Sequence, residues 1–115
     1  MKTQLKTTFR ILIVDDHPTM CDGLCARITN EADMTVCGQA DDVDPALELV
    51  RDLAPDIVLI DISLKTGHGI DLVKQIRQGY PGTKMLVNSM YEESVYAERA
   101  LQAGAMGYLN KQTAG

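Results

Sequence analysis

The sequence predicts an α/β domain with a doubly wound, five-stranded parallel sheet. Two continuous runs of β-branched residues and leucine, Ile11–Val14 and Ile57–Ile60, are typical of strands buried on both faces of such a sheet. Strand-like segments also alternate with segments of helical periodicity in the order βαβαβαβαβ, with short connections. The 115 residues are enough for one such domain and too few for two.

The first part of the chain is expected to form a polar tail, residues 1–8, ahead of the domain, residues 9–115. The strand Phe9–Val14 opens the domain, and His17 and Pro18 follow it. Proline is well placed in the first turn of a helix. Apolar residues at helical spacing and a closing asparagine complete this first helix. These residues are Met20, Leu24, Ile28 and Asn30.

The second helix is expected between the strands Met34–Ala40 and Ile57–Ile60. Asp44 is a suitable N-cap residue, and Pro45 fits the first turn behind it. Pro55 is expected to end the helix. Its apolar stripe would consist of Leu47, Val50 and Ala54.

The third helix follows a loop that contains Lys65–Gly69. Its inward residues are expected to be Ile70, Val73 and Ile76, which recur at helical spacing. The turn signal Tyr80–Gly82 then separates this helix from a fourth strand. That strand is expected at Lys84–Val87, with Asn88 and Ser89 at its end.

The last part of the chain predicts a fourth helix and a short fifth strand, Gly107–Asn110. Glu92 and Glu93 favour a helix start because acidic residues there complement the helix dipole. A fifth helix would normally cover the first and last strands of such a sheet, so we expect that helix to be truncated or replaced by a partner surface. The core face of the fourth helix would carry Ala97, Ala100, Leu101 and Gly104, and its outward face Tyr96, Arg99 and Gln102.

Composition excludes several classes of function. The net charge is −5 and no segment is rich in Lys or Arg, so direct binding of nucleic acid by this chain is not expected. The longest apolar runs are far too short to span a bilayer, and the N-terminus has no apolar core for a signal peptide. These features predict a cytoplasmic protein with no membrane partner.

The three cysteines allow two interpretations. Cys21, Cys25 and Cys37, with His17 nearby, could form a zinc site. The spacing lacks the short paired pattern of a closed tetrahedral site, however, so we expect small buried hydrophobic residues in a reducing compartment.

Polar side chains follow the predicted strands where each strand ends. The carboxyl ends of parallel strands meet at one edge of a sheet, which is where such sheets bind their ligands. The residues at that edge are Asp15 and Asp16 after the first strand, Asp61 after the third, Ser89 after the fourth and Lys111 after the fifth.

The chemistry of that edge predicts a divalent cation and a phosphoryl group. Converging carboxylates repel one another unless a cation lies among them, and carboxylates with water are the ligands that Mg²⁺ prefers. One aspartate could then accept a phosphoryl group whose oxygens interact with the cation, Lys111 and Ser89. Taken singly, each residue could instead be a helix cap, a turn residue or a solvated surface group.

Three segments resemble the receiver domains of two-component response regulators. They are Ile11–Pro18, Pro55–Asp61 and Glu92–Lys111, and the last is similar to the NarL/FixJ (LuxR-type) group. The resemblance covers nearly the whole chain and implies the flavodoxin-like (CheY-like) three-layer sandwich. Lys65 and Gln112 depart from it, because the family often has proline at these positions.

The resemblance implies roles for the acidic residues. Asp61 would be the phosphoacceptor. Asp16 and Asp61 would ligate Mg²⁺ directly, together with the backbone carbonyl of Ser63, and Asp15 would act mainly through water.

The resemblance also implies a signalling switch rather than an enzyme, with only Mg²⁺-dependent self-phosphorylation and autodephosphorylation. Ser89 would be the switch hydroxyl, Tyr108 the switch aromatic and Lys111 the lysine that binds the phosphoryl group. From the residues alone, Tyr108 could equally be a half-buried strand aromatic whose hydroxyl faces water. The phosphodonor would be a sensor histidine kinase. Family members of the NarL type usually continue into a helix-turn-helix domain, so DNA contact is expected through such a C-terminal domain, and a homodimer is a further expected state.

Three rival classes fit the sequence less well. A haloacid-dehalogenase-like phosphatase needs a second aspartate two residues after the nucleophile, where this chain has Ser63. A flavodoxin needs a phosphate loop after the first strand, where Asp15 and Asp16 would repel a flavin phosphate. A degenerate receiver that serves only as a protein-binding platform would not need all five residue types at the sheet edge.

Overall fold

The computed structural model describes residues 8–62, 64, 67–89, 99, 101–102, 104–105 and 107–110. Five parallel strands form one sheet in the order β2-β1-β3-β4-β5, which confirms the predicted doubly wound arrangement. The third and fourth strands extend past their predicted ends to Asp61 and Ser89. In chain order the elements are β1 (Phe9–Val14), α1 (Pro18–Thr29), β2 (Met34–Ala40), α2 (Val43–Leu53), β3 (Ile57–Asp61), α3 (Gly69–Gly79), β4 (Lys84–Ser89) and β5 (Gly107–Asn110).

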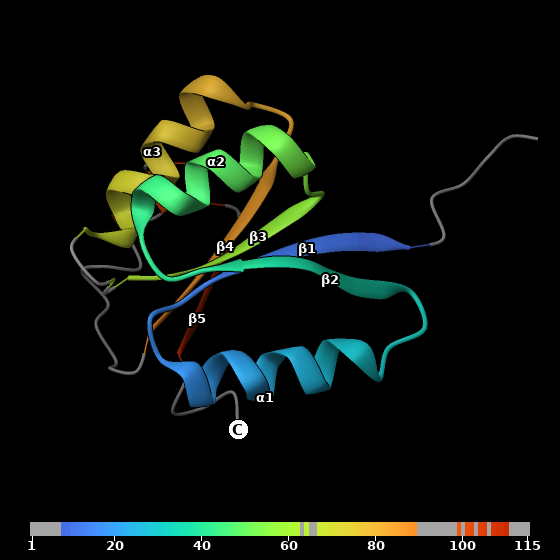
Figure 1. The fold of residues 1–115 in the computed structure, drawn as a ribbon. Coiled ribbons are helices and arrows are strands. Elements are labelled where there is room, and N and C mark those ends of the chain that lie inside the picture. The colour runs from blue at the N-terminus through green and yellow to red at the C-terminus, as the bar shows by residue number, and fades with distance from the viewer. Residues whose placement is uncertain are drawn as a thin grey trace, which may run out of the picture.

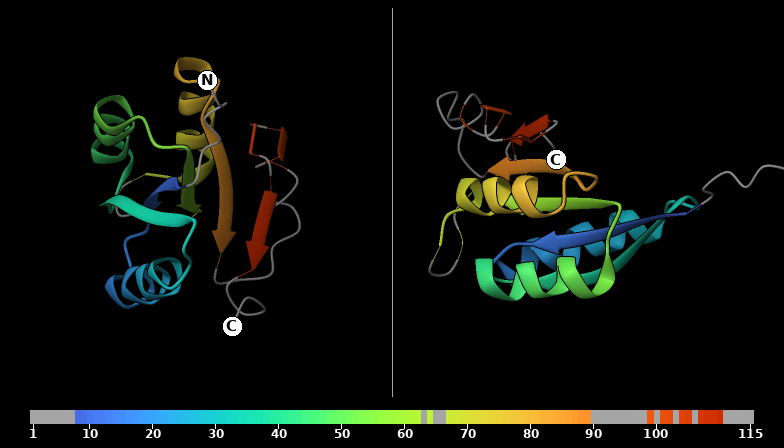
Figure 2. Two further views of the ribbon diagram at one scale, coloured as in Figure 1. Left: turned by 90° about the vertical axis from the view of Figure 1, so that its right-hand side faces the viewer. Right: turned by 90° about the horizontal axis from the view of Figure 1, so that it is seen from above.

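The described helices lie on both faces of the sheet. Helices α2 and α3 lie on one face and α1 on the other (Figure 1). The turned views show β4 and β5 side by side at one edge of the sheet (Figure 2). No helix in the described part of the chain is long and apolar enough to cross a membrane.

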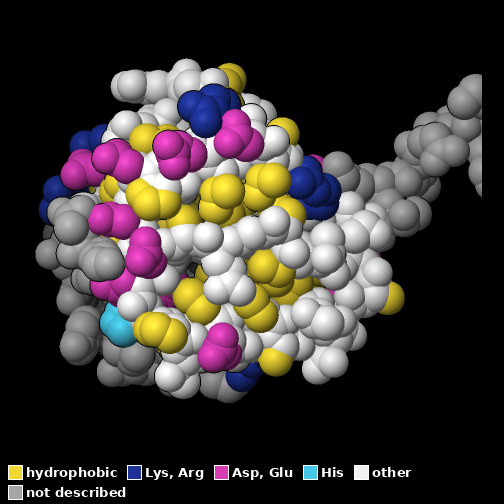
Figure 3. All heavy atoms as spheres, in the orientation of Figure 1, with side chains coloured by type: hydrophobic (Ala, Val, Ile, Leu, Met, Phe, Trp, Pro, Cys, Tyr) yellow, Lys and Arg dark blue, Asp and Glu magenta, His cyan; other side chains and the backbone are white. Residues whose placement is uncertain are grey.

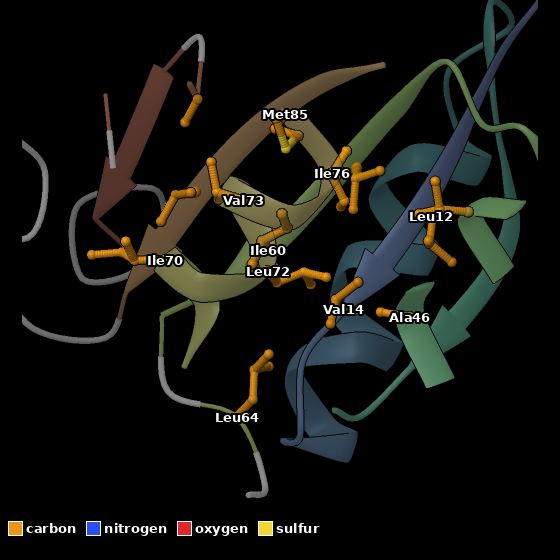
Figure 4. Packing of buried hydrophobic residues seen from close by; sticks show 14 of the residues in the cluster. Leu12, Val14, Ala46, Ile60, Leu64, Ile70, Leu72, Val73, Ile76 and Met85 are labelled. Carbon is orange, nitrogen blue, oxygen red and sulfur yellow. The ribbon is translucent and has the colours of Figure 1, made fainter. Parts of the chain in front are cut away.

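The larger core cluster lies between the sheet and the helices α2 and α3 (Figure 4). Alternate residues of β1 and β3 point into it, because successive side chains of a strand face opposite sides of the sheet. The predicted inward residues of α3 are confirmed, since Ile70, Val73 and Ile76 are all at most 2% exposed. The strand residues in this cluster include Leu12, Val14, Val58, Ile60, Met85 and Val87.

The opposite face of the sheet is less completely covered. There Ile11 and Ile13 pack against Cys21 and Ile28 of α1. The prediction that the third strand is buried on both faces is wrong for this side, where its residues Ile57 and Leu59 are only partly buried. The reason is that α1 alone, among the described helices, packs on this face (Figure 1).

The N-cap of the second helix lies two residues before the predicted cap. Asp42, not Asp44, is the N-cap residue, with extended backbone and a side chain that accepts a hydrogen bond from the N–H of Val43. The same carboxylate oxygen accepts from the N–H of Gly67, so this position satisfies two backbone donors.

The other end of α2 also differs from the prediction. Ala54 was expected in the apolar stripe, but it is the exposed C-cap residue with φ 47°. Of the predicted stripe, Val50 is buried and Leu47 is partly buried against the core, and Ala46 is buried beside them. Pro55 follows the cap, in agreement with its predicted role as the helix stop.

The predicted fourth helix lies mostly outside the described residues. Arg99, Leu101 and Gln102 are helical, and Arg99 and Gln102 are exposed as predicted. Leu101 was expected on the core face with Ala97 and Ala100, but it is 51% exposed because nothing in the described part of the chain covers it.

Candidate functional site

The carboxylates predicted to converge lie together at the carboxyl ends of β1 and β3. The parallel register of these strands places Asp15 beside Asp61, and both residues are only 3% exposed. Asp16 is partly buried next to them. One ligand atom from each of these residues and one from His17 all lie within 4.8 Å of one another. The convergence of Asp15, Asp16 and Asp61 is therefore confirmed.

A histidine completes this cluster. The Nδ1 atom of His17 lies 2.8 Å from Asp15 Oδ1, 3.0 Å from Asp16 Oδ1 and 3.3 Å from Asp61 Oδ2. Acidic side chains gather on the side of the molecule where β1 and β2 end, and a histidine side chain lies beside them (Figure 3). The sequence alone suggested His17 as a ligand only together with the cysteines. Its position directly after Asp15 and Asp16 could have indicated that it joins the carboxylates.

The ring nitrogen alone cannot satisfy three carboxylates. A histidine nitrogen carries at most one hydrogen, so Nδ1 can donate to one oxygen at a time. Asp15 Oδ1 lies closest to it and also accepts the backbone N–H of His17 at 2.8 Å. Asp16 Oδ1 is buried and accepts no hydrogen bond from the described part of the chain. This set of oxygen donors fits a divalent cation, which would offset the repulsion among the carboxylates.

The loop after β3 passes so close to the strand end that it requires glycine. A Cβ atom on Gly69 would overlap the carbonyl oxygen of Asp61 and lie 2.8 Å from the Cα atom of Ile62. The N–H of Gly69 also donates to the carbonyl oxygen of Ile62 at 2.6 Å. This glycine therefore fixes the backbone at Asp61, a role that the sequence analysis missed although glycine is the usual sign of a close backbone approach.

A buried amide lies on the neighbouring strand. Asn88 pairs in register with Asp61, so the two side chains project from the same face of the sheet. Asn88 is only 6% exposed, and its Oδ1 atom accepts no hydrogen bond from the described residues. Its backbone carbonyl accepts from the N–H of Ile62 at 3.2 Å, which ties the end of β4 to the residue after Asp61.

The remaining predicted site residues are placed only in part. Ser89 ends β4 and pairs with Asn110, while Tyr108 pairs with Val87 in the middle of β5. The backbone of Ser89 thus reaches the predicted sheet edge, and the side chains of Ser89 and Tyr108 are outside the described part of the structure. The predictions for Ser63 and Lys111 also lie outside the described residues.

The cysteines make separate contacts rather than a shared site. Cys21 is buried and its thiol donates to the carbonyl oxygen of Asp15 at 3.3 Å. Cys25 Sγ accepts from the side chain of Gln39 at 2.9 Å, and burial raises the pKa of the Cys37 thiol. Among the described residues, no cysteine belongs to a potential metal cluster. The expectation of small buried residues holds for Cys21, whereas Cys25 and Cys37 are only partly buried.

A groove of about 440 Å³ adjoins the carboxylates. Asp15 and Asp16 form part of its wall, and the rest comes from the first turns of α1 and α2, the end of β2 and the residue after β2. Solvent can therefore reach Asp15 and Asp16 between these two helix starts, whereas Asp61 does not line the groove. The other lining residues are Pro18, Cys21, Gln39, Ala40, Asp41 and Pro45.

The fold and the acidic cluster together define a doubly wound domain with a group of carboxylates at the carboxyl edge of its sheet that could hold a metal ion. The family model of the response regulator receiver domain matches residues 11–115, and the chain belongs to this family.

Relatives of known sequence are LuxR-family and NarL-type regulators. The chain is 33% identical over 102 residues to the response regulator GacA of Pseudomonas aeruginosa, covering 89% of this chain and 48% of GacA. It is 32% identical over 108 residues to the uncharacterized transcriptional regulatory protein YxjL of Bacillus subtilis, covering 94% of this chain and 50% of YxjL. The chain thus spans about half the length of these curated relatives.

Solved structures agree with this assignment. A LuxR-family response regulator from Aurantimonas sp. SI85-9A1 superposes with a TM-score of 0.87 at 36% identity, covering 90% of this chain and 74% of that one. The signal receiver domain of the putative response regulator NarL from Mycobacterium tuberculosis gives a TM-score of 0.87 at 31% identity, covering 92% and 86%. These likenesses confirm the predicted CheY-like fold.

Proposed function

We propose that this chain is the phosphoacceptor of a two-component response regulator, and that Asp61 takes a phosphoryl group from the phosphohistidine of a sensor histidine kinase. The observation that carries the proposal is the burial of Asp61 beside Asp15 and Asp16 at the carboxyl edge of the sheet. A carboxylate oxygen of Asp61 would attack the phosphorus atom. The O–P bond would form as the N–P bond breaks, and the electron pair would leave with the donor imidazole, which then takes up a proton.

The proposed cofactor is Mg²⁺ at the same cluster. Asp16 and Asp61 would hold the ion directly with the backbone carbonyl of Ser63, and Asp15 would hold it through water. When bound, the ion would supply positive charge to the oxygens of the transferring phosphoryl group. The oxygen-rich donor set supports this choice, because Mg²⁺ prefers carboxylates, carbonyls and water.

The other predicted residues would respond to the new phosphate. Ser89 and Lys111 would bind phosphoryl oxygens, and the position of Ser89 at the end of β4 supports its part in this proposal. Movement of Ser89 toward the phosphate would leave space for Tyr108, one strand further along the sheet. The surface formed by the fourth helix and β5 would then switch between two states.

The output would lie outside this chain. The curated relatives are about twice as long, and several are named as transcriptional regulators. We therefore propose a C-terminal DNA-binding domain as the element that the switch controls, with a homodimer as its active form. The net charge of −5 makes direct DNA contact by this chain unfavourable.

The proposal is tested by incubating the protein with acetyl phosphate and Mg²⁺ and measuring its intact mass. We expect wild-type protein to gain one phosphoryl group and Asp61→Asn to gain none. Asp56→Asn is the matched control, because Asp56 lies at the other end of β3 and should not affect labelling. Chelation of Mg²⁺ should prevent the gain in mass. Labelling of Asp61→Asn to the wild-type level would refute the assignment.

A further inference from the structure

The ring of His17 lies where it can share a bound ion with the carboxylates. Its Nδ1 atom is 2.8–3.3 Å from one oxygen of each of the three aspartates. Two ligands on adjacent vertices of an octahedral ion with bonds of about 2.1 Å are separated by about 3.0 Å, which is that bond length multiplied by the square root of two. The three separations from Nδ1 are therefore compatible with a nitrogen that neighbours carboxylate oxygens around one ion.

Helix capping does not account for the position of the His17 ring. His17 is the N-cap residue of α1, but its side chain makes no capping hydrogen bond. The other histidine provides a contrast within the same chain, because the Nδ1 atom of His68 caps α3 by accepting from the N–H of Ile70 at 3.2 Å. The imidazole of His17 instead points its Nδ1 atom toward the acidic cluster.

An imidazole ligand changes which ion the site should prefer. Oxygen ligands alone suit Mg²⁺, whereas imidazole nitrogen suits ions of the first transition series. An imidazole added to the oxygen ligands should therefore raise the affinity of the site for Mn²⁺ and Ni²⁺ relative to Mg²⁺. The affinity for Ni²⁺ should exceed that for Mn²⁺, because divalent ions follow this order at most nitrogen and oxygen donors.

We propose that His17 Nδ1 is a fourth protein ligand of the metal site when the ring carries its proton on Nε2, and that it raises the affinity of the site for divalent transition ions relative to Mg²⁺. This inference rests on the proposed function, because it assigns a ligand and an ion class to the same cluster. The half-exposed ring can follow the ion without disturbing the core, since 51% of the His17 side chain is accessible.

The test compares tag-free wild-type protein with His17→Asn and the matched control His68→Asn. Asparagine replaces the nitrogen donor by an oxygen donor at position 17, and it can still cap the helix at position 68. With Mn²⁺ bound, pulsed electron paramagnetic resonance should show ¹⁴N coupling in the wild type and in His68→Asn, and none in His17→Asn. Circular dichroism should be the same for all three proteins.

Calorimetry supplies the second measurement. The ratio of Ni²⁺ to Mg²⁺ affinity should fall at least about tenfold in His17→Asn and stay unchanged in His68→Asn. Absence of ¹⁴N coupling in the wild type would overturn the inference. An equal rise in affinity for both ions in His17→Asn would also overturn it, because the ring would then be an obstacle to the ion rather than a ligand.

The inference and the proposed function can fail separately. If acetyl phosphate labels Asp61 but wild-type Mn²⁺ shows no ¹⁴N coupling, the function stands and the fourth ligand does not. If the coupling is present but Asp61 is never labelled, the metal site stands and the phosphoacceptor role does not.

Discussion

Charged side chains are arranged differently at the two ends of the parallel sheet. At the amino end, Asp56 accepts a hydrogen bond from the N–H of Arg10 at 2.8 Å, and the side chain of Arg10 donates to the carbonyl oxygens of Leu53 and Ala54. At the carboxyl end, three carboxylates surround the single ring nitrogen of His17. One end joins opposite charges and dipoles, and the other gathers like charges.

This difference separates stability from function along one strand. Asp56 precedes β3 and Asp61 ends it, so the same five-residue strand links both environments. Groups with satisfied partners stabilise the folded state, whereas clustered carboxylates cost stability until a cation binds. Substitutions at the amino end should therefore change unfolding free energy alone, and substitutions at the carboxyl end should change metal binding or phosphorylation as well.

The largest effect on the carboxyl end is expected from Gly69→Ala. The new Cβ atom would overlap the backbone of Asp61, and backbone cannot move aside as a flexible side chain can. We expect a loss of at least about 2 kcal/mol in unfolding free energy, typical of severe overpacking. Phosphorylation by acetyl phosphate should fall with it, because the acceptor carboxylate would be displaced. Urea denaturation and intact mass measure the two effects.

Gly79→Ala is the control at the opposite end of the same helix. A Cβ atom at Gly79 would meet nothing within 4 Å, so alanine should be neutral or should stabilise the helix by up to about 1 kcal/mol. Equal stability of Gly69→Ala and Gly79→Ala would contradict the close approach of the loop to Asp61.

The sequence predicted which carboxylates converge at the carboxyl end of the sheet, but it did not predict the other contacts around them. Apolar runs that end in aspartate were enough to predict that Asp15, Asp16 and Asp61 converge, because strand direction and burial follow from local pattern. The role of Gly69 depends on how a loop folds back on a strand, and a glycine alone does not show which residue the loop approaches. The contact between His17 and Asp61 likewise joins residues 44 positions apart in the chain.

The other errors also arose from contacts between distant parts of the chain. Asp42 and Asp44 are equally good caps by residue type, and the structure uses Asp42, whose carboxylate also binds the N–H of Gly67 across the α2–α3 side of the molecule. The apolar residues Ile57 and Leu59 predicted burial on both faces, but burial depends on which helices cover the sheet. Local propensity defines what a segment can form, and its neighbours decide how it is used.

A smaller effect, confined to the amino end, is expected from Arg10→Met. Methionine keeps much of the apolar stem but removes the donor to Leu53 and Ala54 at the end of α2. Loss of these charge-assisted hydrogen bonds should lower the unfolding free energy by about 1–2 kcal/mol. Mg²⁺ affinity and phosphorylation should stay at wild-type levels, as measured by calorimetry and intact mass.

Arg51→Met is the matched control for Arg10→Met. Arg51 pairs with Asp52 at 2.8 Å, but both side chains are more than half exposed. Exposed ion pairs contribute little because water and salt screen them, so this change should leave the denaturation midpoint unmoved. A change in Mg²⁺ affinity on replacing Arg10 would show that the two ends of the sheet are coupled.

The smallest effect is expected from Asn88→Leu, at the carboxyl end of the sheet. Leucine has a similar shape and removes a buried amide whose Oδ1 atom accepts no hydrogen bond from the described residues. The unfolding free energy should rise by about 1 kcal/mol, because an unsatisfied buried polar group is lost. Asn30→Leu, at an exposed helix end, should bring no such gain. If Asn88→Leu is instead less stable than the wild type, the amide stabilises the fold. The polar groups at the carboxyl end would then not lower the unfolding free energy in the way proposed.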